Sequence, residues 1–260
     1  MNLTVVGCHG GETPKHRTSG FVLRSGKRAI AIDAGCLTSG LTLREQCALD
    51  AVLVSHGHMD HLKDLATLAD NRCQNGCAPL EIVGIKQTID ILKEHFFNNL
   101  LWPDFTKIPT ARQPTIAYRV LKSEAQTDVA GFDVRAIMVS HTIDACAFVV
   151  RSKNGRVLAY SGDTGPTDRL WEVLNATPDL SMMLMEISFP NEQQKLATVS
   201  GHHTPQTLAP ELLKLDRHKD VPMLLYHIKP TFERTVAREL SKIKNGTDLT
   251  ILNIGDEFKL

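Results

Sequence analysis

Short apolar runs alternate with amphipathic stretches along the whole chain. Apolar runs followed by turn residues predict strands, over residues 2–7, 28–35, 50–56, 132–141, 145–152, 156–163, 180–188 and 222–228. Apolar positions at helical spacing predict helices, over residues 59–70, 86–101, 166–175, 204–215 and 231–245. Antiparallel-type hairpins in the first half and alternating strands and helices in the second predict an α/β sandwich of sheets covered by helices, in one domain over residues 1–260.

Several predicted strands end on residues that bind metals. Strand ends at one rim of a sheet lie close in space, so seven nitrogen and oxygen donors could converge: His56, His58, Asp60, His61, His141, Asp163 and His227. Seven donors are too many for one tetrahedral zinc and favour two metals that share a carboxylate. His141 or His227 alone would read as an ordinary surface residue. The dense run "HGHMDH" directly after a buried strand does not.

Composition and charge narrow the function classes. The chain has 29 basic and 29 acidic residues and a net charge of zero, which disfavours long nucleic acids and anionic membranes as partners. The first residues lack a signal-peptide pattern, and no run approaches the roughly 18 apolar residues of a membrane span. Six scattered cysteines are expected to be reduced thiols in a cytoplasmic protein. Cys73 and Cys77 could bind a metal, but two free thiols are the favoured interpretation.

The run "HGHMDH" resembles the signature of the metallo-β-lactamase superfamily. The resemblance implies an αββα sandwich of two mixed sheets flanked by helices, with a two-metal site at its edge. The resemblance also implies which donors bind which metal. His56, His58 and His141 would bind one metal, Asp60, His61 and His227 would bind the other, and Asp163 would bridge the two. Zinc is the first expectation for the two divalent ions, and manganese or iron would also suit such donors.

Further motifs resemble one branch of that superfamily, the class II cyclic-nucleotide phosphodiesterases: "VVGCHGG", "TSGFVL", "IDAGCL", "MEISFPN", "LATVSGHHTP" and "YHIKP". This resemblance implies hydrolysis of a 3′,5′-cyclic nucleotide, cyclic AMP or cyclic GMP, to its 5′-monophosphate by a hydroxide that two metals activate. In "SGHHTP" it maps the general acid to His202, with His203 as a bystander. Asp60 is the second expected catalytic residue. A homodimer is a family-level expectation.

Two other functions stay open. A tRNA 3′-processing endonuclease resembling RNase Z would share the fold, but the segment between Asp163 and His202 is short, near neutral and offers no basic arm to grip tRNA. Short RNase Z forms lack the arm too, so its absence does not exclude an RNase Z-like function. The other alternative is a non-catalytic metal-binding or nucleotide-sensing protein, against which the complete donor set and His202 argue.

Some further residues have two interpretations each. Asp33 either orients a ligand loop, as the family resemblance implies, or caps a turn. His9, in a glycine-rich loop, either approaches substrate or is solvated. The aromatic stretch 96–109 is either a lid over the site or part of the core or of a dimer contact, and the core or dimer interpretation is favoured. The remaining isolated histidines are expected to be ordinary surface residues: His16, His95 and His218.

Overall fold

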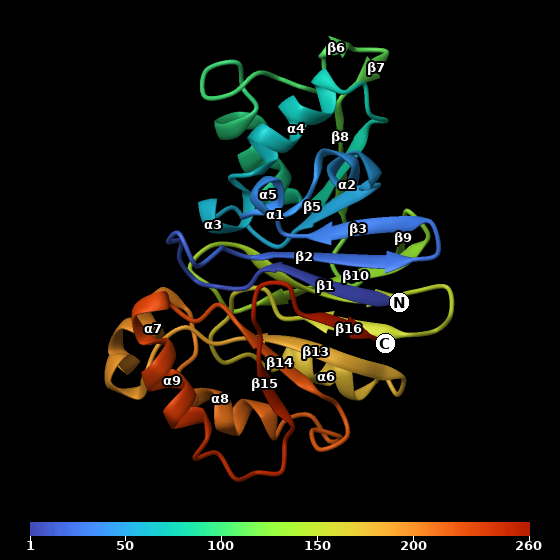
Figure 1. Ribbon diagram of the computed structural model, residues 1–260. Coiled ribbons are helices and arrows are strands. Elements are labelled where there is room, and N and C mark those ends of the chain that lie inside the picture. Colours follow the sequence, from blue (N-terminus) through green and yellow to red (C-terminus); the bar gives the residue numbers. More distant parts are fainter.

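The protein is an αββα sandwich (Figure 1). The computed structural model describes residues 1–260, in which two seven-stranded sheets pack face to face and a two-stranded sheet lies apart from them. Helices of the first half of the chain cover the outer face of one sheet, and helices of the second half cover the outer face of the other. The sandwich predicted from the sequence is confirmed, including the mixed strand directions in both sheets.

The first sheet has the strand order β16-β1-β2-β3-β4-β5-β8. Strands β16, β1, β2 and β3 pair antiparallel, and β3, β4, β5 and β8 pair parallel. Its strands are β1 (Asn2–Gly7), β2 (Gly20–Ser25), β3 (Arg28–Ile32), β4 (Ala51–Val54), β5 (Leu80–Ile85), β8 (Ile116–Leu121) and β16 (Glu257–Lys259). Strands β1, β3 and β4 lie within predicted segments, whereas β2, β5, β8 and β16 lie outside them.

The second sheet has the order β15-β14-β13-β12-β11-β10-β9. Strands β9 to β12 pair antiparallel, and β12 to β15 pair parallel. Its strands are β9 (Thr127–Val129), β10 (Phe132–Val139), β11 (Ala145–Arg151), β12 (Val157–Tyr160), β13 (Leu180–Glu186), β14 (Met223–Tyr226) and β15 (Leu249–Ile251). The separate small sheet pairs β6 (Pro109–Thr110) with β7 (Gln113–Pro114). Five of these strands lie in predicted segments: β10, β11, β12, β13 and β14.

The helices are short. The first half of the chain forms α1 (Leu37–Gly40), α2 (Leu43–Ala48), α3 (Met59–Leu62), α4 (Leu65–Gln74) and α5 (Lys86–Ile91). The second half forms α6 (Arg169–Asn175), α7 (Gln194–Ser200), α8 (Pro205–Leu212) and α9 (Glu233–Leu240), with 3₁₀ turns at Asn191–Gln193 and Pro230–Phe232. The helix predicted over 59–70 is therefore two helices, α3 and α4.

The helix predicted over 86–101 is wrong in its second half. Helix α5 ends at Ile91, and a π-helical turn, Leu92–Phe96, follows it. The Asn98 side chain then accepts hydrogen bonds from the backbone N–H groups of Leu100 and Leu101, at 2.9 and 2.8 Å. Asn99 adopts a left-handed conformation with φ of 63°. This side-chain turn satisfies the backbone in place of a helix, as asparagine commonly does.

Three apolar layers hold the sandwich together. One lies between the two sheets, one lies between the first sheet and its helices, and one lies between the second sheet and its helices. The aromatic stretch 96–109 belongs to the second layer: Phe96, Phe97 and Phe105 are buried there. Trp102 packs against the same layer, and its indole N–H donates to the Ala66 carbonyl at 3.1 Å. These aromatic side chains are core residues.

The cysteines depart from the expectation of six free thiols. Cys47 in α2 and Cys77 after α4 form a disulfide, with their Cα atoms 5.3 Å apart, within the usual range for such a bond. Cys73 is not the partner of Cys77 and remains a free thiol. The pairing depends on the contact between α2 and α4, which spacing along the chain does not reveal. None of the helices is long and apolar enough to cross a membrane.

Candidate metal centre

Four of the predicted donors come from one short turn after β4. All four residues of β4 are buried, and His56 follows two residues after the strand as a fully buried side chain. His58 has an extended backbone and caps α3, whose first turn carries Asp60 and His61. Gly57 lies between His56 and His58, at a position where a Cβ atom would lie 2.7 Å from the Ile91 side chain. The turn therefore supplies two histidines from the segment before the helix and two donors from the helix start.

The other three donors come from strand ends of the second sheet. His141 follows β10, Asp163 follows β12, and His227 follows β14. His227 has a φ of 73°, in the left-handed region that non-glycine residues seldom adopt. Such backbone strain is found where the surrounding structure fixes a functional side chain. The seven predicted side chains meet at one edge of the sandwich, where the two sheets face each other.

His56, His58 and His141, here called the first trio, face a common point. The His58 Nδ1 atom lies 3.1 Å from His56 Nε2 and 3.2 Å from His141 Nε2. Ligand atoms on a tetrahedral zinc with bonds of about 2.0–2.1 Å are about 3.3 Å apart. The spacing within the first trio matches this edge length.

Asp60, His61 and His227 form the second trio. His227 Nε2 lies 3.3 Å from His61 Nε2 and 3.3 Å from Asp60 Oδ2. The His61 Nε2 to Asp60 Oδ2 distance is 3.9 Å. Asp60 is the most exposed member, with 30% of its side-chain surface accessible, whereas the two histidines are buried. Solvent therefore reaches the second trio at the Asp60 carboxylate.

Asp163 lies between the two trios. Its Oδ2 atom is 3.2 Å from His61 Nε2, 3.2 Å from His227 Nε2 and 3.8 Å from His56 Nε2. Its Oδ1 atom is buried and has no hydrogen-bond partner in the protein. A buried carboxylate oxygen without a partner is costly, and a bound cation would satisfy it. The orphaned oxygen, the nitrogen spacing and the imidazole-rich donor set all fit divalent metal ions at this site.

A second layer of hydrogen bonds orients the imidazole rings. The Nδ1 atoms of four histidines contact oxygen atoms: Ser55 Oγ at 3.0 Å for His56, Asp33 Oδ2 at 2.7 Å for His61, the Gly201 carbonyl at 3.0 Å for His141, and Ser188 Oγ at 2.9 Å for His227. Each ring then presents Nε2 to the centre, as in known metal sites. His58 is the exception and presents Nδ1. Asp33 supports a donor side chain, as the family resemblance implied.

The pKa shifts of the first trio differ in direction from that of His61. Burial lowers the pKa of His56, His58 and His141, so these rings are held neutral, the form that binds a metal. Burial would also lower the pKa of His61, but the carboxylates of Asp163 and Asp33 raise it well above its ordinary value. The carboxylates of Asp163 and Asp33 thus place His61 in a negative field, which favours a cation beside it.

His202 lies directly beside both trios. Its ring stacks on that of His227 with centroids 5.2 Å apart, and it packs edge-to-face with the His141 ring with centroids 5.1 Å apart. Its Nδ1 atom is 3.4 Å from Glu186 Oε1. The neighbouring His203 instead contacts Thr207 in α8 through its Nδ1, at 3.2 Å. Of the two histidines in "SGHHTP", only His202 has its ring against donors of both trios.

The chain is similar in sequence to a known protein family. Residues 28–228 match the family described as the beta-lactamase superfamily domain. The chain belongs to this family. It is 29% identical over 230 residues to a probable 3′,5′-cyclic-nucleotide phosphodiesterase of Yersinia pestis, an alignment that covers 78% of this chain and 65% of that protein. It is 25% identical over 247 residues to the 3′,5′-cyclic-nucleotide phosphodiesterase of Aliivibrio fischeri, covering 77% of this chain and 72% of that one. The chain thus spans slightly less than two thirds of the Yersinia relative.

Several solved structures have the same fold. Unliganded yeast PDE1 superposes with a TM-score of 0.84 at 21% identity, covering 100% of this chain and 99% of that one. The metallo-β-lactamase fold protein YhfI of Bacillus subtilis gives 0.78 at 19% identity, covering 99% of each chain. The short form of human tRNase Z gives 0.71 at 20% identity, covering 100% and 99%. At these identities the likeness shows the fold alone.

Glu186 is a residue of this beta-lactamase superfamily site that sequence reasoning did not assign. It ends β13, is fully buried, and accepts hydrogen bonds from the His203 backbone N–H at 3.0 Å and from Ser188 Oγ at 3.1 Å. Burial raises its pKa to about 7. Its position between His202 and Ser188 connects the expected general acid to the partner of His227. A single acid in the otherwise uncharged segment 180–188 was the available signal.

Proposed function

We propose that this chain is a metal-dependent phosphodiesterase that hydrolyses 3′,5′-cyclic nucleotides, cyclic AMP or cyclic GMP, to 5′-monophosphates. The observation that carries the proposal is the placement of His202 against two trios of donors that share Asp163. A metal-binding sensor has no need of a proton donor at that position. The names of the Yersinia and Aliivibrio relatives support the substrate class.

The proposal places two divalent ions, zinc first and manganese or iron as alternatives, on the seven donors. The first trio would hold one ion, the second trio would hold the other, and Asp163 would contribute to both. When bound, the ions would supply Lewis acidity, which activates water near neutral pH and offsets negative charge on the phosphoryl oxygens. The remaining chemistry belongs to the side chains of the protein itself.

His202 would protonate the leaving 3′ oxygen as the bond from phosphorus to that oxygen breaks. The Glu186 carboxylate lies beside Nδ1, which leaves Nε2 as the nitrogen that delivers the proton. Burial lowers the pKa of the His202 ring, and the carboxylate of Asp163 opposes this shift, which favours the imidazolium form that a general acid requires. Asp60, the exposed carboxylate of the second trio, would accept the proton that the attacking water loses. One water is consumed: its oxygen forms the new bond to phosphorus, one of its protons passes to Asp60, and the other stays on the new phosphate oxygen or is lost to solvent. His202 then regains a proton from solvent.

The test is a substrate panel with purified, zinc-loaded protein. Cyclic AMP, cyclic GMP, bis(p-nitrophenyl) phosphate and a tRNA precursor are compared for turnover. We expect cyclic-nucleotide hydrolysis, a loss of about 10²–10⁴ in kcat for His202→Ala with bound metal unchanged, and loss of both metal and activity for Asp163→Ala. His95→Ala, which removes an exposed histidine, is the matched control.

Several results would count against the proposal. Cleavage of the tRNA precursor without hydrolysis of cyclic nucleotides would favour the RNase Z-like endonuclease. Binding of metal without turnover of any ester would favour a sensor. Wild-type rates in His202→Ala would remove the general-acid role. A homodimer and a cytoplasmic location also stay predictions, which analytical ultracentrifugation and cell fractionation would check.

A further inference from the structure

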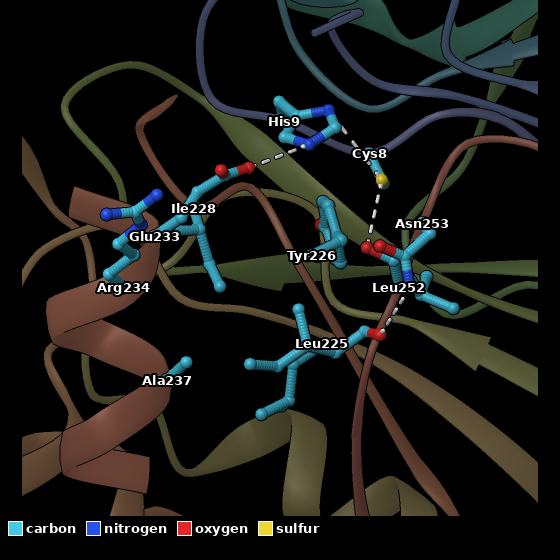
Figure 2. Close-up of a pocket in the computed structure, with 11 residues that line it drawn as sticks. Cys8, His9, Leu225, Tyr226, Ile228, Glu233, Arg234, Ala237, Leu252 and Asn253 are labelled. Carbon is cyan, nitrogen blue, oxygen red and sulfur yellow. Dashed lines mark hydrogen bonds and ion pairs between the residues drawn. The ribbon is translucent and has the colours of Figure 1, made fainter. Parts of the chain in front are cut away.

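A third group of donors lies outside the seven: His9, His16 and Glu233, here called the His9 cluster. Glu233 Oε1 is 3.1 Å from His9 Nε2 and 3.3 Å from His16 Nε2. Figure 2 shows His9 and Glu233 pointing toward each other among the residues that line a pocket beside α9. The cluster thus brings two imidazole nitrogens and one carboxylate oxygen to a common point.

Polar contacts to the Nδ1 atoms orient both rings of the His9 cluster. His16 Nδ1 contacts Thr13 Oγ1 at 2.5 Å, and His9 Nδ1 contacts the Arg17 carbonyl at 3.3 Å. These contacts leave Nε2 as the inward atom of each ring, the arrangement that outer partners impose on metal-ligating histidines. The ring centroids are 4.7 Å apart at 79°, so the two nitrogens approach the carboxylate from different directions.

The backbone of the loop that carries the histidines is itself fixed. Thr13 and His16 exchange two backbone hydrogen bonds of 3.1 Å, and the backbone N–H groups of Cys8 and His9 both donate to the Arg17 carbonyl. Side-chain exposure is 12% for His9, 21% for His16 and 41% for Glu233. The histidines are therefore held in place while the carboxylate stays open to solvent, which gives an ion a way in.

We propose that the His9 cluster binds a divalent transition-metal ion of the zinc class, in addition to the ions of the seven-donor centre. Two histidines and a glutamate are a ligand set that zinc uses in three-ligand sites, with a further position left for water. The distances of 3.1 and 3.3 Å agree with the roughly 3.3 Å between neighbouring ligands of a tetrahedral zinc. A hydrogen-bonded carboxylate without a metal is the alternative, and a count of bound zinc separates the two.

The position of the His9 cluster suggests what the ion does. The Gly10 N–H donates to the Ile228 carbonyl at 3.1 Å, and the His227 N–H donates to the Cys8 carbonyl at 2.7 Å. An ion on His9 and Glu233 would therefore tie the first turn of α9 to the loop that supports His227. Because the ion would share no donor with the seven-donor centre, its role would be structural: it would hold the first turn of α9 against that loop.

The test measures zinc per chain on the full-length protein. Metal-free wild type, His16→Ala, Glu233→Gln and the control His95→Ala are dialysed against the same buffered zinc solution, and bound zinc is determined by mass spectrometry. We expect wild type and His95→Ala to bind the same amount and each cluster variant to bind one zinc fewer. Equal zinc in all four proteins would overturn the proposal.

A second measurement does not depend on the variants folding. Crystals of zinc-loaded wild type, measured at the zinc absorption edge, should show an anomalous peak at roughly 2.0–2.2 Å from His9 Nε2, His16 Nε2 and a Glu233 oxygen. Density at the seven-donor centre but none at this position would overturn the inference. Failure of the proposed phosphodiesterase activity would leave it standing, because neither readout uses turnover.

Discussion

Asp33→Asn would test how far one buried carboxylate supports the metal centre. Asp33 Oδ2 accepts hydrogen bonds from Ser55 Oγ at 2.9 Å and Tyr160 OH at 2.5 Å, and contacts His61 Nδ1 at 2.7 Å. Its Oδ1 atom accepts from the Ser55 backbone N–H at 2.8 Å. Asparagine keeps the shape of the side chain, but it removes the charge and replaces one acceptor oxygen by an NH₂ group.

The expected loss follows from these contacts. If the amide oxygen of asparagine faces the three side chains, each of these hydrogen bonds loses its charged acceptor and weakens by about 1 kcal/mol. The Ser55 N–H then faces the NH₂ group and is left without an acceptor, which costs about 1–3 kcal/mol. The resulting range of about 4–6 kcal/mol is an upper bound, because a neutral amide costs less to bury than a carboxylate. We expect the free energy of unfolding of the metal-free protein to fall by about 2–5 kcal/mol. We expect zinc affinity at the second trio to fall by about 10–100-fold, since His61 loses its orienting partner.

Urea unfolding of the metal-free protein and zinc titration with a competing chelator measure the two effects. Tyr160→Phe is the matched control, because it removes one donor to Asp33 and leaves the His61 contact in place. It should cost about 1 kcal/mol of stability and leave zinc affinity unchanged. An Asp33→Asn protein with wild-type zinc affinity would refute the view that Asp33 orients His61.

Three further changes have expected outcomes. Glu186→Gln should lower kcat at least about tenfold while bound metal and KM stay unchanged, because His202 loses the carboxylate beside Nδ1; wild-type kcat would contradict this. Trp102→Ala should cost about 2–4 kcal/mol in thermal unfolding and leave KM unchanged, because its ring packs in the core; a raised KM would point to a lid. Gly10→Ala should weaken zinc binding and turnover, because its Cβ would lie 2.3 Å from the His227 carbonyl, whereas the control Gly11→Ala meets only Pro230, at 3.1 Å.

Local sequence was sufficient to predict the elements that carry the seven donors. His56 to His61 directly follow an apolar strand, and so dense a set of imidazole and carboxylate groups seldom occurs there unless it binds an ion. His141, Asp163 and His227 also follow apolar runs, and the family resemblance put them in one site. The sandwich itself followed from the order of strands and helices. The predictions of these elements and of the sandwich succeed because hydropathy period and strand ends are properties of contiguous residues.

Contacts between distant segments could not be predicted in the same way. Glu186 touches His202 only because the chain returns through α7 to the end of β13. Cys47 meets Cys77 through the packing of α2 on α4. His16, expected to be an ordinary surface residue, meets Glu233 from the far end of the chain. In each case the second residue is fixed by tertiary packing, and spacing along the sequence carries no trace of it.

The two trios divide their donors between the two sheets in the same way. The first trio takes His56 and His58 from the end of β4 in the first sheet and His141 from the end of β10 in the second. The second trio takes Asp60 and His61 from the first sheet's connection and His227 from the end of β14. Neither sheet alone supplies three donors to either point, so the complete sites exist only when the sandwich is closed. An ion that binds only the closed form must stabilise it, by an amount set by its affinity and concentration. The cost of burying Asp163 Oδ1 without a partner is then a cost of the metal-free protein, and metal binding removes it.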